Sequence, residues 1–123
     1  MTPLSIGTWN VHTRLDNPTA DRPERRTALV ARELARCNIA IAALSETRLA
    51  NRGQLTETGG GYTFFWSGRD AGVGFAVRSH LVRKLACLPK GANERLMTLQ
   101  LPRQNRSQAT LISAYAPTTP RTR

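Results

Sequence analysis

The stretch Ile39-Ala40-Ile41-Ala42-Ala43-Leu44 is apolar at every position, and it decides the fold. A short continuous apolar run is typical of a strand that is buried on both faces of a sheet. Ser45 and Glu46 follow the run directly. A purely structural strand would continue into apolar side chains or a turn, so the carboxylate at this strand end is a candidate functional group.

A helix is predicted before this strand. Asp21 is a suitable N-cap, Pro23 suits the first helical turn, and Glu24 completes a capping box. The helix is expected to run to about Cys37 and to end at Asn38. Its inner face is predicted from residues at helical spacing, namely Thr27, Val30, Ala31 and Leu34.

Strands dominate the remainder of the chain. The expected strands are residues 4–11, 62–67, 71–77, 96–101 and 109–115. The last two of these form a hairpin with a long basic connection. Strand, helix and strand at the start of the chain follow the order of a crossover unit, which makes the two strands parallel. One main helix followed mostly by strands predicts an α/β (α+β) fold with a mixed sheet.

The segments between these strands are predicted to be connections. Residues 51–58 are expected to form a loop, and Gly59-Gly60-Gly61 a turn. Residues 79–88 are expected to contain a short turn and then an extended segment, and residues 90–93 a further turn. The aromatic residues within 62–66 alternate in direction along their strand, so we expect them to be core residues more than base-stacking residues.

The composition describes a basic protein of one-domain length. The 123 residues include 18 Lys and Arg against 8 Asp and Glu, a net charge of +10, which favours polyanionic partners such as nucleic acid. Most of this charge is arginine, which suits phosphate, although the base composition of the gene would produce the same bias. The apolar runs are too short for a membrane span, and no secretory signal is recognisable. Cys37 and Cys87 are expected to be reduced, half-buried thiols in an intracellular protein, with the nucleus as one candidate compartment.

Three segments place polar side chains at the ends of strand-like runs: Thr8-Trp9-Asn10-Val11, Leu44-Ser45-Glu46-Thr47-Arg48 and Tyr115-Ala116-Pro117-Thr118. Ligands in α/β sheets gather outside the carboxyl ends of strands, so Asn10, Glu46 and Tyr115 are expected to meet in space. In this order the segments resemble the endonuclease/exonuclease/phosphatase family, which hydrolyses phosphodiesters with Mg²⁺. Within it, they are most similar to the abasic-site-endonuclease-like domain of non-LTR retrotransposons and to the craniofacial-development-protein-2-like sequences.

The resemblance implies a fold and a domain boundary. The family has a four-layer α/β sandwich, and residues 1–118 resemble only its N-terminal portion, which predicts a partial sandwich. Residues 119–123 are expected to be a disordered tail. The chain stops where the family's Asp-x-Asn and Ser-Asp-His segments would follow, so the resemblance predicts a truncated domain with little or no activity alone.

The resemblance gives four residues a role, and Arg48 is added because of its position two residues after Glu46. Glu46 matches the principal metal ligand, and Asn10 matches the residue that orders the metal and the catalytic carboxylates. Tyr115 matches a tyrosine that hydrogen-bonds a phosphate oxygen, although a threonine stands where many members continue with asparagine. Arg95 and Arg48 would contact substrate phosphate. The ordinary alternatives are an ion pair of Glu46 with Arg48, an Asx turn at Asn10, a packed Tyr115 and a solvated Arg95.

The resemblance also implies a cofactor and a substrate. Mg²⁺, with Mn²⁺ as the alternative, would be held weakly because Glu46 is the one matched carboxylate. The leading hypothesis is a truncated DNA endonuclease domain of retrotransposon origin. Two other hypotheses stay open: a non-catalytic basic nucleic-acid-binding fragment, and a phosphatase of the same family acting on a phosphoinositide or phospholipid headgroup.

Half of a sandwich is expected to expose an apolar sheet face and an unpaired strand edge. We therefore expect the isolated chain to be marginally stable, to self-associate, or to need a missing C-terminal half. A cooperative thermal transition of a monomer at high temperature would contradict this expectation.

Overall fold

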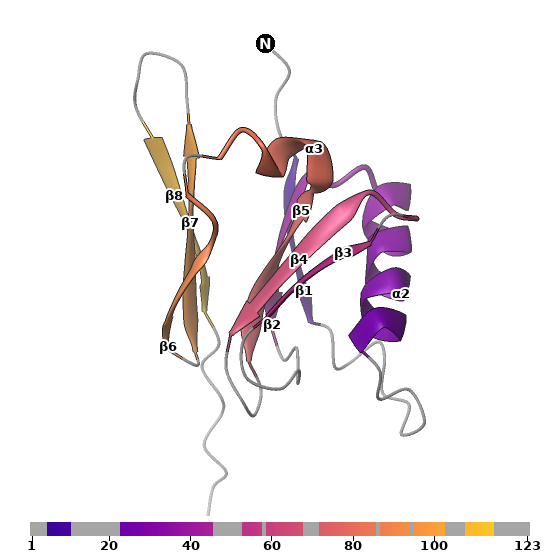
Figure 1. Ribbon diagram of the computed structural model, residues 1–123, viewed down its shortest axis with the longest axis horizontal. Coiled ribbons are helices and arrows are strands. Elements are labelled where there is room, and N and C mark those ends of the chain that lie inside the picture. Colours follow the sequence, from indigo (N-terminus) through magenta and orange to yellow (C-terminus); the bar gives the residue numbers. More distant parts are fainter. Residues whose placement is uncertain are drawn as a thin grey trace, which may run out of the picture.

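The computed structural model has three layers, with sheet A between helix α2 and sheet B (Figure 1). It describes residues 5–10, 23–45, 53–57, 59–67, 72–85, 87–93, 95–102 and 108–114. Sheet A contains, in spatial order, β1 (Ile6–Asn10), β2 (Ile41–Ser45), β5 (Val73–Arg78), β4 (Tyr62–Ser67) and β3 (Gly53–Glu57). Sheet B contains β6 (Lys90–Asn93), β7 (Leu96–Pro102) and β8 (Gln108–Ala114). The helices are α2 (Pro23–Arg36) and α3 (Ser79–Val82).

Sheet A is mixed, as predicted. β1 and β2 run parallel, with α2 between them in the chain, and the other neighbouring strands of sheet A are antiparallel. β7 and β8 form the predicted antiparallel hairpin. The α/β (α+β) class with one main helix is therefore confirmed. The predicted boundary at residue 118 and the tail at 119–123 lie outside the described residues.

The inner face of α2 is the predicted one. Its four predicted residues are at most 3% exposed, and they are Thr27, Val30, Ala31 and Leu34. The helix begins at Pro23, whose fixed φ suits the first turn. Asp21 and the Glu24 side chain, which were predicted to form the capping box, lie outside the described part of the chain.

Two nested backbone hydrogen bonds end α2 at Asn38, as predicted. The Asn38 N–H donates to the Ala35 carbonyl oxygen at 3.0 Å, and the Ile39 N–H donates to the Leu34 carbonyl oxygen at 2.9 Å. This pair of bonds is a Schellman ending. Asn38 has a φ of 58°, in the left-handed region that asparagine adopts more readily than most residues. The chain then turns into β2.

β2 is buried on both faces, as its sequence predicts. Ala42 and Leu44 pack in the cluster beneath α2, whereas Ile41 packs between the two sheets. Apolar side chains from both sheets fill this second cluster, namely Ile41, Phe65, Val73, Phe75, Val77, Met97, Leu99 and Leu101. The strand that decides the fold is thus held by packing on each side.

The aromatic residues of β4 belong to the core, as expected. Tyr62 and Phe64 pack under α2, and Phe65 packs between the sheets. The Tyr62 hydroxyl donates a hydrogen bond to the Ile39 carbonyl oxygen. Burial raises the pKa of Tyr62, and the nearby Arg78 guanidinium opposes this shift. The hydroxyl therefore stays protonated, as a donor, across the neutral pH range.

Two segments predicted to be connections are strands instead. Residues 53–57 form β3 and residues 90–93 form β6, and each is the outermost strand of its sheet. An edge strand is partly solvated, so it needs no continuous apolar pattern. In β3 the indole ring of Trp66 covers Gly53, where a Cβ would lie 2.4 Å from the ring. These polar, glycine-containing strands are not recognisable from apolar periodicity.

The prediction for residues 79–88 is also wrong in its first half. Residues 79–82 form the short helix α3, and its Leu81 and Val82 pack against the cluster between the sheets. Both cysteines are free, as expected, but they are exposed instead of half-buried. Neither described helix is long and apolar enough to cross a membrane.

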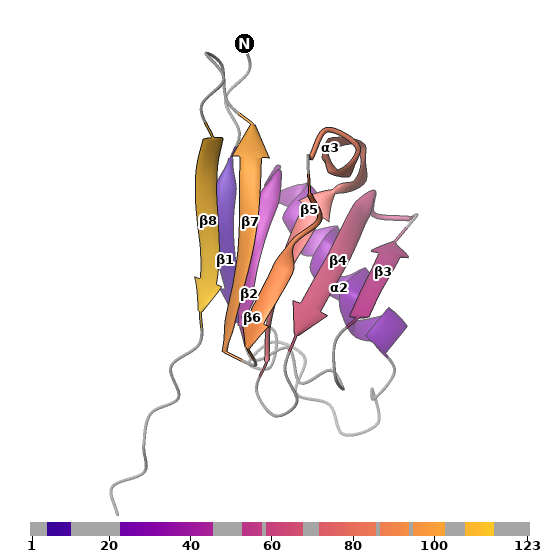
Figure 2. The same ribbon diagram turned by 60° about the vertical axis from the view of Figure 1, so that its left-hand side comes forward.

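Sheet A is covered on both faces, so the predicted exposed apolar sheet face is wrong for the described residues. The outer face of sheet B carries mainly polar residues such as Gln100 and Thr110, and Ile112, at 59% exposure, is its largest exposed apolar residue. The predicted unpaired edge can be examined among the described strands alone. Within the described strands, β1 and β8 pair on one side only, and they lie on the same flank (Figure 2).

Candidate functional site

The carboxyl ends of β1 and β2 lie side by side. Their parallel register pairs Asn10 with Ser45, the last residues of the two strands. The Asn10 side chain is exposed, and its amide can both donate and accept hydrogen bonds. Glu46 follows Ser45 directly in the sequence. The first two predicted segments therefore meet at neighbouring positions of one sheet.

β8 of sheet B is joined to the same end of sheet A. The Ser113 hydroxyl donates a 2.9 Å hydrogen bond to the carbonyl oxygen of Leu44, and Ser113 is 2% exposed. This bond connects the sheets one residue before β2 and β8 end. Tyr115 follows Ala114, the last residue of β8. The third predicted segment thus directly follows β8 in the sequence, although its residues lie outside the described part of the chain.

The turn before β7 reaches the same end. Leu96 pairs with Ala114, and Arg95, with an exposed side chain, directly precedes Leu96. Figures 1 and 2 show the ends of β1, β2 and β8 together at the lower end of the molecule. We call this region the strand-end site, defined by Asn10, Ser45, Arg95 and Ala114.

The structure describes two of the five predicted site residues, Asn10 and Arg95, and both lie at the strand-end site. Glu46, Arg48 and Tyr115 lie outside the described residues. The chemical roles of all five stay predictions.

A hydrated magnesium ion is the cation that the sequence predicts for the strand-end site. Mg²⁺ is usually held by one or two carboxylates and keeps several waters. Asn10 offers an amide oxygen, and Glu46, one position beyond Ser45, is the candidate carboxylate. Among the described side chains, no three His, Cys, Asp or Glu residues gather in a metal-binding group. A cation site at this end would therefore depend on Glu46.

The sequence model of the Endonuclease/Exonuclease/phosphatase family matches residues 7–114. The chain belongs to this family. The match begins in β1 and ends with the last residue of β8, so it includes every strand that forms the strand-end site. No curated protein matches the chain significantly.

Two solved structures are similar to the chain in fold. The AP endonuclease LMAP from Leishmania major has a TM-score of 0.54 and 22% identity over 88% of this chain and 38% of its own. TDP2 from D. rerio, complexed with a single strand DNA product, has a TM-score of 0.52 and 20% identity over 89% of this chain and 44% of its own. The chain thus spans less than half the length of either family structure. At these identities the likeness establishes the fold alone.

Ser113 is the residue that the sequence analysis did not identify. Leu111 and Ser113 lie on the side of β8 that faces sheet A, whereas Ile112 lies on the outer side. A serine at an inward position of an alternating strand is a usable signal, because a buried hydroxyl needs a partner. The identity of that partner depends on how the two sheets stack, which the sequence does not reveal.

Replacing Ser113 with alanine is expected to destabilise the protein by about 1–3 kcal/mol, because the Leu44 carbonyl oxygen loses a buried donor. Urea unfolding followed by circular dichroism measures the loss. Thr110→Val removes a hydroxyl from an exposed position of the same strand and should change stability by less than about 0.5 kcal/mol. Equal effects of the two substitutions would contradict a role for Ser113 in joining the sheets.

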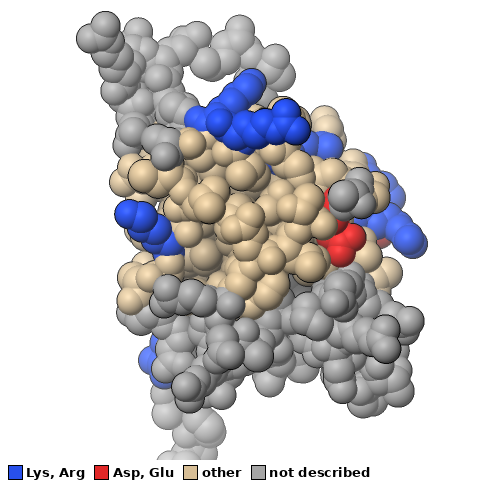
Figure 3. All heavy atoms as spheres, in the orientation of Figure 1, with Lys and Arg blue, Asp and Glu red and all other residues tan. Residues whose placement is uncertain are grey.

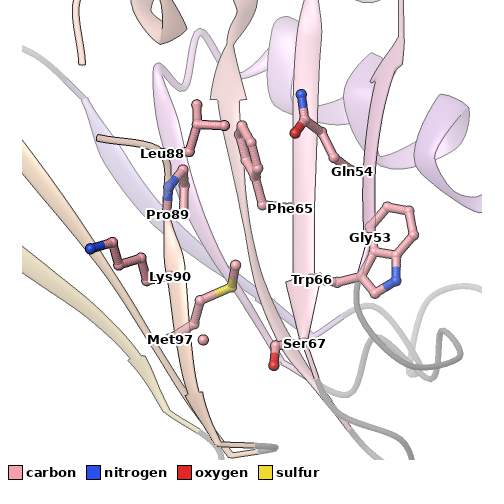
Figure 4. Close-up of a pocket in the computed structure, with 10 residues that line it drawn as sticks. Gly53, Gln54, Phe65, Trp66, Ser67, Leu88, Pro89, Lys90 and Met97 are labelled. Carbon is pink, nitrogen blue, oxygen red and sulfur yellow. The ribbon is translucent and has the colours of Figure 1, made fainter. Parts of the chain in front are cut away.

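A separate pocket of about 480 Å³ lies at the opposite flank, where β3 and β4 face β6 (Figure 4). Phe65 and Gln54 extend toward Leu88 across this pocket, and Met97 forms part of its wall. The ammonium group of Lys90 points away from it. The lining is mainly apolar and includes none of the predicted site residues, so the pocket suits an apolar group more than the phosphates on which this family acts.

Proposed function

We propose that the chain is part of a Mg²⁺-dependent DNA endonuclease domain, of the kind found in non-LTR retrotransposons, with weak activity of its own. The convergence of the strand ends carries this proposal. Asn10 pairs with Ser45 directly before Glu46, and Ser113 joins β8 to β2 two residues before Tyr115. The ends of β1, β2 and β8, which are far apart in the sequence, therefore lie at one end of the described structure.

Each residue of the proposed site has a chemical task. Glu46 would hold the cation, with Asn10 beside it. A bound Mg²⁺ polarises a phosphate oxygen and stabilises the negative charge that develops during hydrolysis. Arg48 and Arg95 would pair with phosphate oxygens through charge-assisted hydrogen bonds, and the Tyr115 hydroxyl would donate a further one.

The charge of the chain supports DNA as the substrate class. The net charge of +10 favours a polyanion over a single headgroup. Of the two similar structures, one is an AP endonuclease and the other holds a single strand DNA product. We therefore prefer DNA to a phosphoinositide or phospholipid headgroup.

Glu46→Ala is expected to lower Mg²⁺-dependent nicking of supercoiled plasmid at least about 100-fold, because a cation ligand contributes several kcal/mol to the transition state. Nicking is measured at low salt with Mg²⁺ and with EDTA. Glu33→Ala is the matched control, since Glu33 is a carboxylate on α2 that pairs with Arg36 away from the site. The control should nick at the wild-type rate.

Three outcomes separate the hypotheses. Loss of nicking in Glu46→Ala and in EDTA supports the endonuclease. Equal nicking by wild type and Glu46→Ala contradicts it. Absence of nicking together with salt-dependent DNA binding that ignores Glu46 and Mg²⁺ supports the second candidate, a non-catalytic nucleic-acid-binding fragment. Arg78, Arg83 and Lys84, which lie at α3, are the observation that makes nucleic-acid binding without catalysis the second candidate.

A further inference from the structure

A basic surface lies at the end of the molecule opposite the strand-end site. Its cations are Arg78, Arg83 and Lys84, and we call it the α3 basic surface. β5 connects the two ends, because Val73 pairs with Ser45 at the strand-end site and Arg78 is the last residue before α3. The five residue steps along this strand correspond to about 17 Å. The two regions are therefore distinct.

Arg78 is held in place by two contacts. Its guanidinium carbon lies 5.0 Å from the centroid of the Tyr62 ring, a cation–π arrangement. One guanidinium nitrogen donates to the Asn38 side-chain oxygen at 3.4 Å. A guanidinium carries five N–H donors, so these contacts engage only part of its capacity. The side chain is ordered in advance of any ligand, which lowers the entropy cost of binding.

Arg83 and Lys84 extend this surface into solvent, since both are exposed. Positive side chains gather over α3 in Figure 3, with no acidic side chain among those drawn in colour there. The carboxylates of the described side chains are engaged elsewhere: Glu33 pairs with Arg36, and Glu57 accepts a hydrogen bond from Thr27. The α3 basic surface therefore presents a concentrated positive potential to an incoming anion.

The chemistry of this surface favours a phosphate backbone over a lipid bilayer. Insertion into a bilayer interface requires exposed apolar side chains beside the cations. In α3, Leu81 and Val82 pack against the core instead. The large apolar residues exposed in the described part of the chain lie outside α3, namely Ile6, Leu29, Leu88 and Ile112. Arginine, in addition, matches phosphate geometry.

We propose that the α3 basic surface is a second nucleic-acid contact, which binds the phosphate backbone away from the strand-end site. This inference rests on the proposed function only in taking DNA as the polyanion. About 17 Å corresponds to about five nucleotide steps along one strand, at 3.4 Å per step. A duplex of about twenty base pairs is therefore long enough to contact both regions.

The two lysines of the chain provide a matched test. Lys84 and Lys90 are the only lysines, and both are exposed, but Lys90 lies on β6 outside the α3 basic surface. Binding of a labelled twenty-base-pair duplex is measured by fluorescence anisotropy in EDTA, between 50 and 200 mM NaCl. Lys84→Gln, Arg83→Gln/Lys84→Gln and Lys90→Gln are compared with wild type, and circular dichroism verifies that each is folded.

Each lost phosphate contact should reduce the slope of log affinity against log salt by about 0.9 and weaken binding roughly 5- to 10-fold at 0.1 M salt. We expect Lys84→Gln to show the effect of one lost contact and the double variant the effect of two. Lys90→Gln should change the affinity less than 2-fold. Equal weakening by Lys84→Gln and Lys90→Gln would mean a diffuse charge effect and would overturn the proposal.

Two other results would reject the proposal. No weakening by the double variant rejects the surface as a DNA contact. If instead the double variant loses binding to vesicles that contain phosphatidylserine and keeps its DNA affinity, the partner is a membrane and the proposal is wrong. The assay contains no Mg²⁺ and measures no cleavage, so it can succeed where the nicking experiment fails, and the two failures are distinguishable.

Discussion

Replacing Gly74 with alanine is expected to destabilise the protein by about 3 kcal/mol, the upper end of the usual cost of overpacking. A Cβ at this position would lie 2.4 Å from the carbonyl oxygen of Phe65. The opposing atom belongs to the backbone of β4, so no side-chain rotation relieves the clash, and two paired strands must move apart. Gly74 also pairs with Leu44, and the displacement would therefore reach β2 and the strand-end site.

Gly59→Ala is the control for this substitution. A Cβ at Gly59 would meet no atom within 4 Å, so the change in stability should stay within about 0.5 kcal/mol. Both variants are compared with wild type by urea unfolding. Against a typical total stability of about 5–15 kcal/mol, the Gly74 variant should unfold at a clearly lower urea concentration. Coincident unfolding curves for the two variants would contradict the predicted clash.

Leu34→Ala is expected to lower stability by about 2–5 kcal/mol. Leu34 is 1% exposed and packs between α2 and sheet A, so truncation leaves a cavity in the cluster that also contains Leu44 and Tyr62. Thermal unfolding monitored by circular dichroism should show a large fall in the midpoint.

Leu29→Ala makes the same chemical change on the other side of the same helix. Leu29 is 40% exposed, and its truncation should cost less than about 1 kcal/mol. Comparison of the two variants separates the effect of packing on stability from that of helix propensity, because both substitutions replace leucine with alanine in α2. Similar costs for the two would mean that α2 does not pack on sheet A as the structure describes.

The buried parts of the fold could be predicted because burial leaves a pattern in the sequence. The apolar run at 39–44 identified a strand covered on two faces, and the spacing of Val30, Ala31 and Leu34 identified the inner face of α2. The edges left no such pattern. β3 depends on Gly53 lying under the indole of Trp66, a cross-strand contact that becomes visible only when the strands are paired.

The candidate site could be predicted to a similar extent. Polar residues at the ends of apolar runs indicated that the carboxyl ends of several strands would lie close together. The pairing of Asn10 with Ser45 agrees with that expectation. The way in which the two sheets stack could not be predicted, because it depends on how their side chains pack against each other. The hydrogen bond from Ser113 to Leu44 is the clearest instance, since 69 positions separate the two residues.

Among the described strands, β1 and β8 each pair on one side only, and this has a consequence for how the strand-end site can be completed. Both edges lie on one flank, and both strands end at the strand-end site. Any strand that joined either edge would run about 4.8 Å from its neighbour, so its terminal residues would stand next to Asn10 or Ala114. The strand that paired with either edge would thus determine which side chains stand beside the strand-end site. Under the proposed endonuclease function, the site would be completed by quaternary or domain complementation, in which two polypeptide segments, covalently joined or not, share one reaction centre.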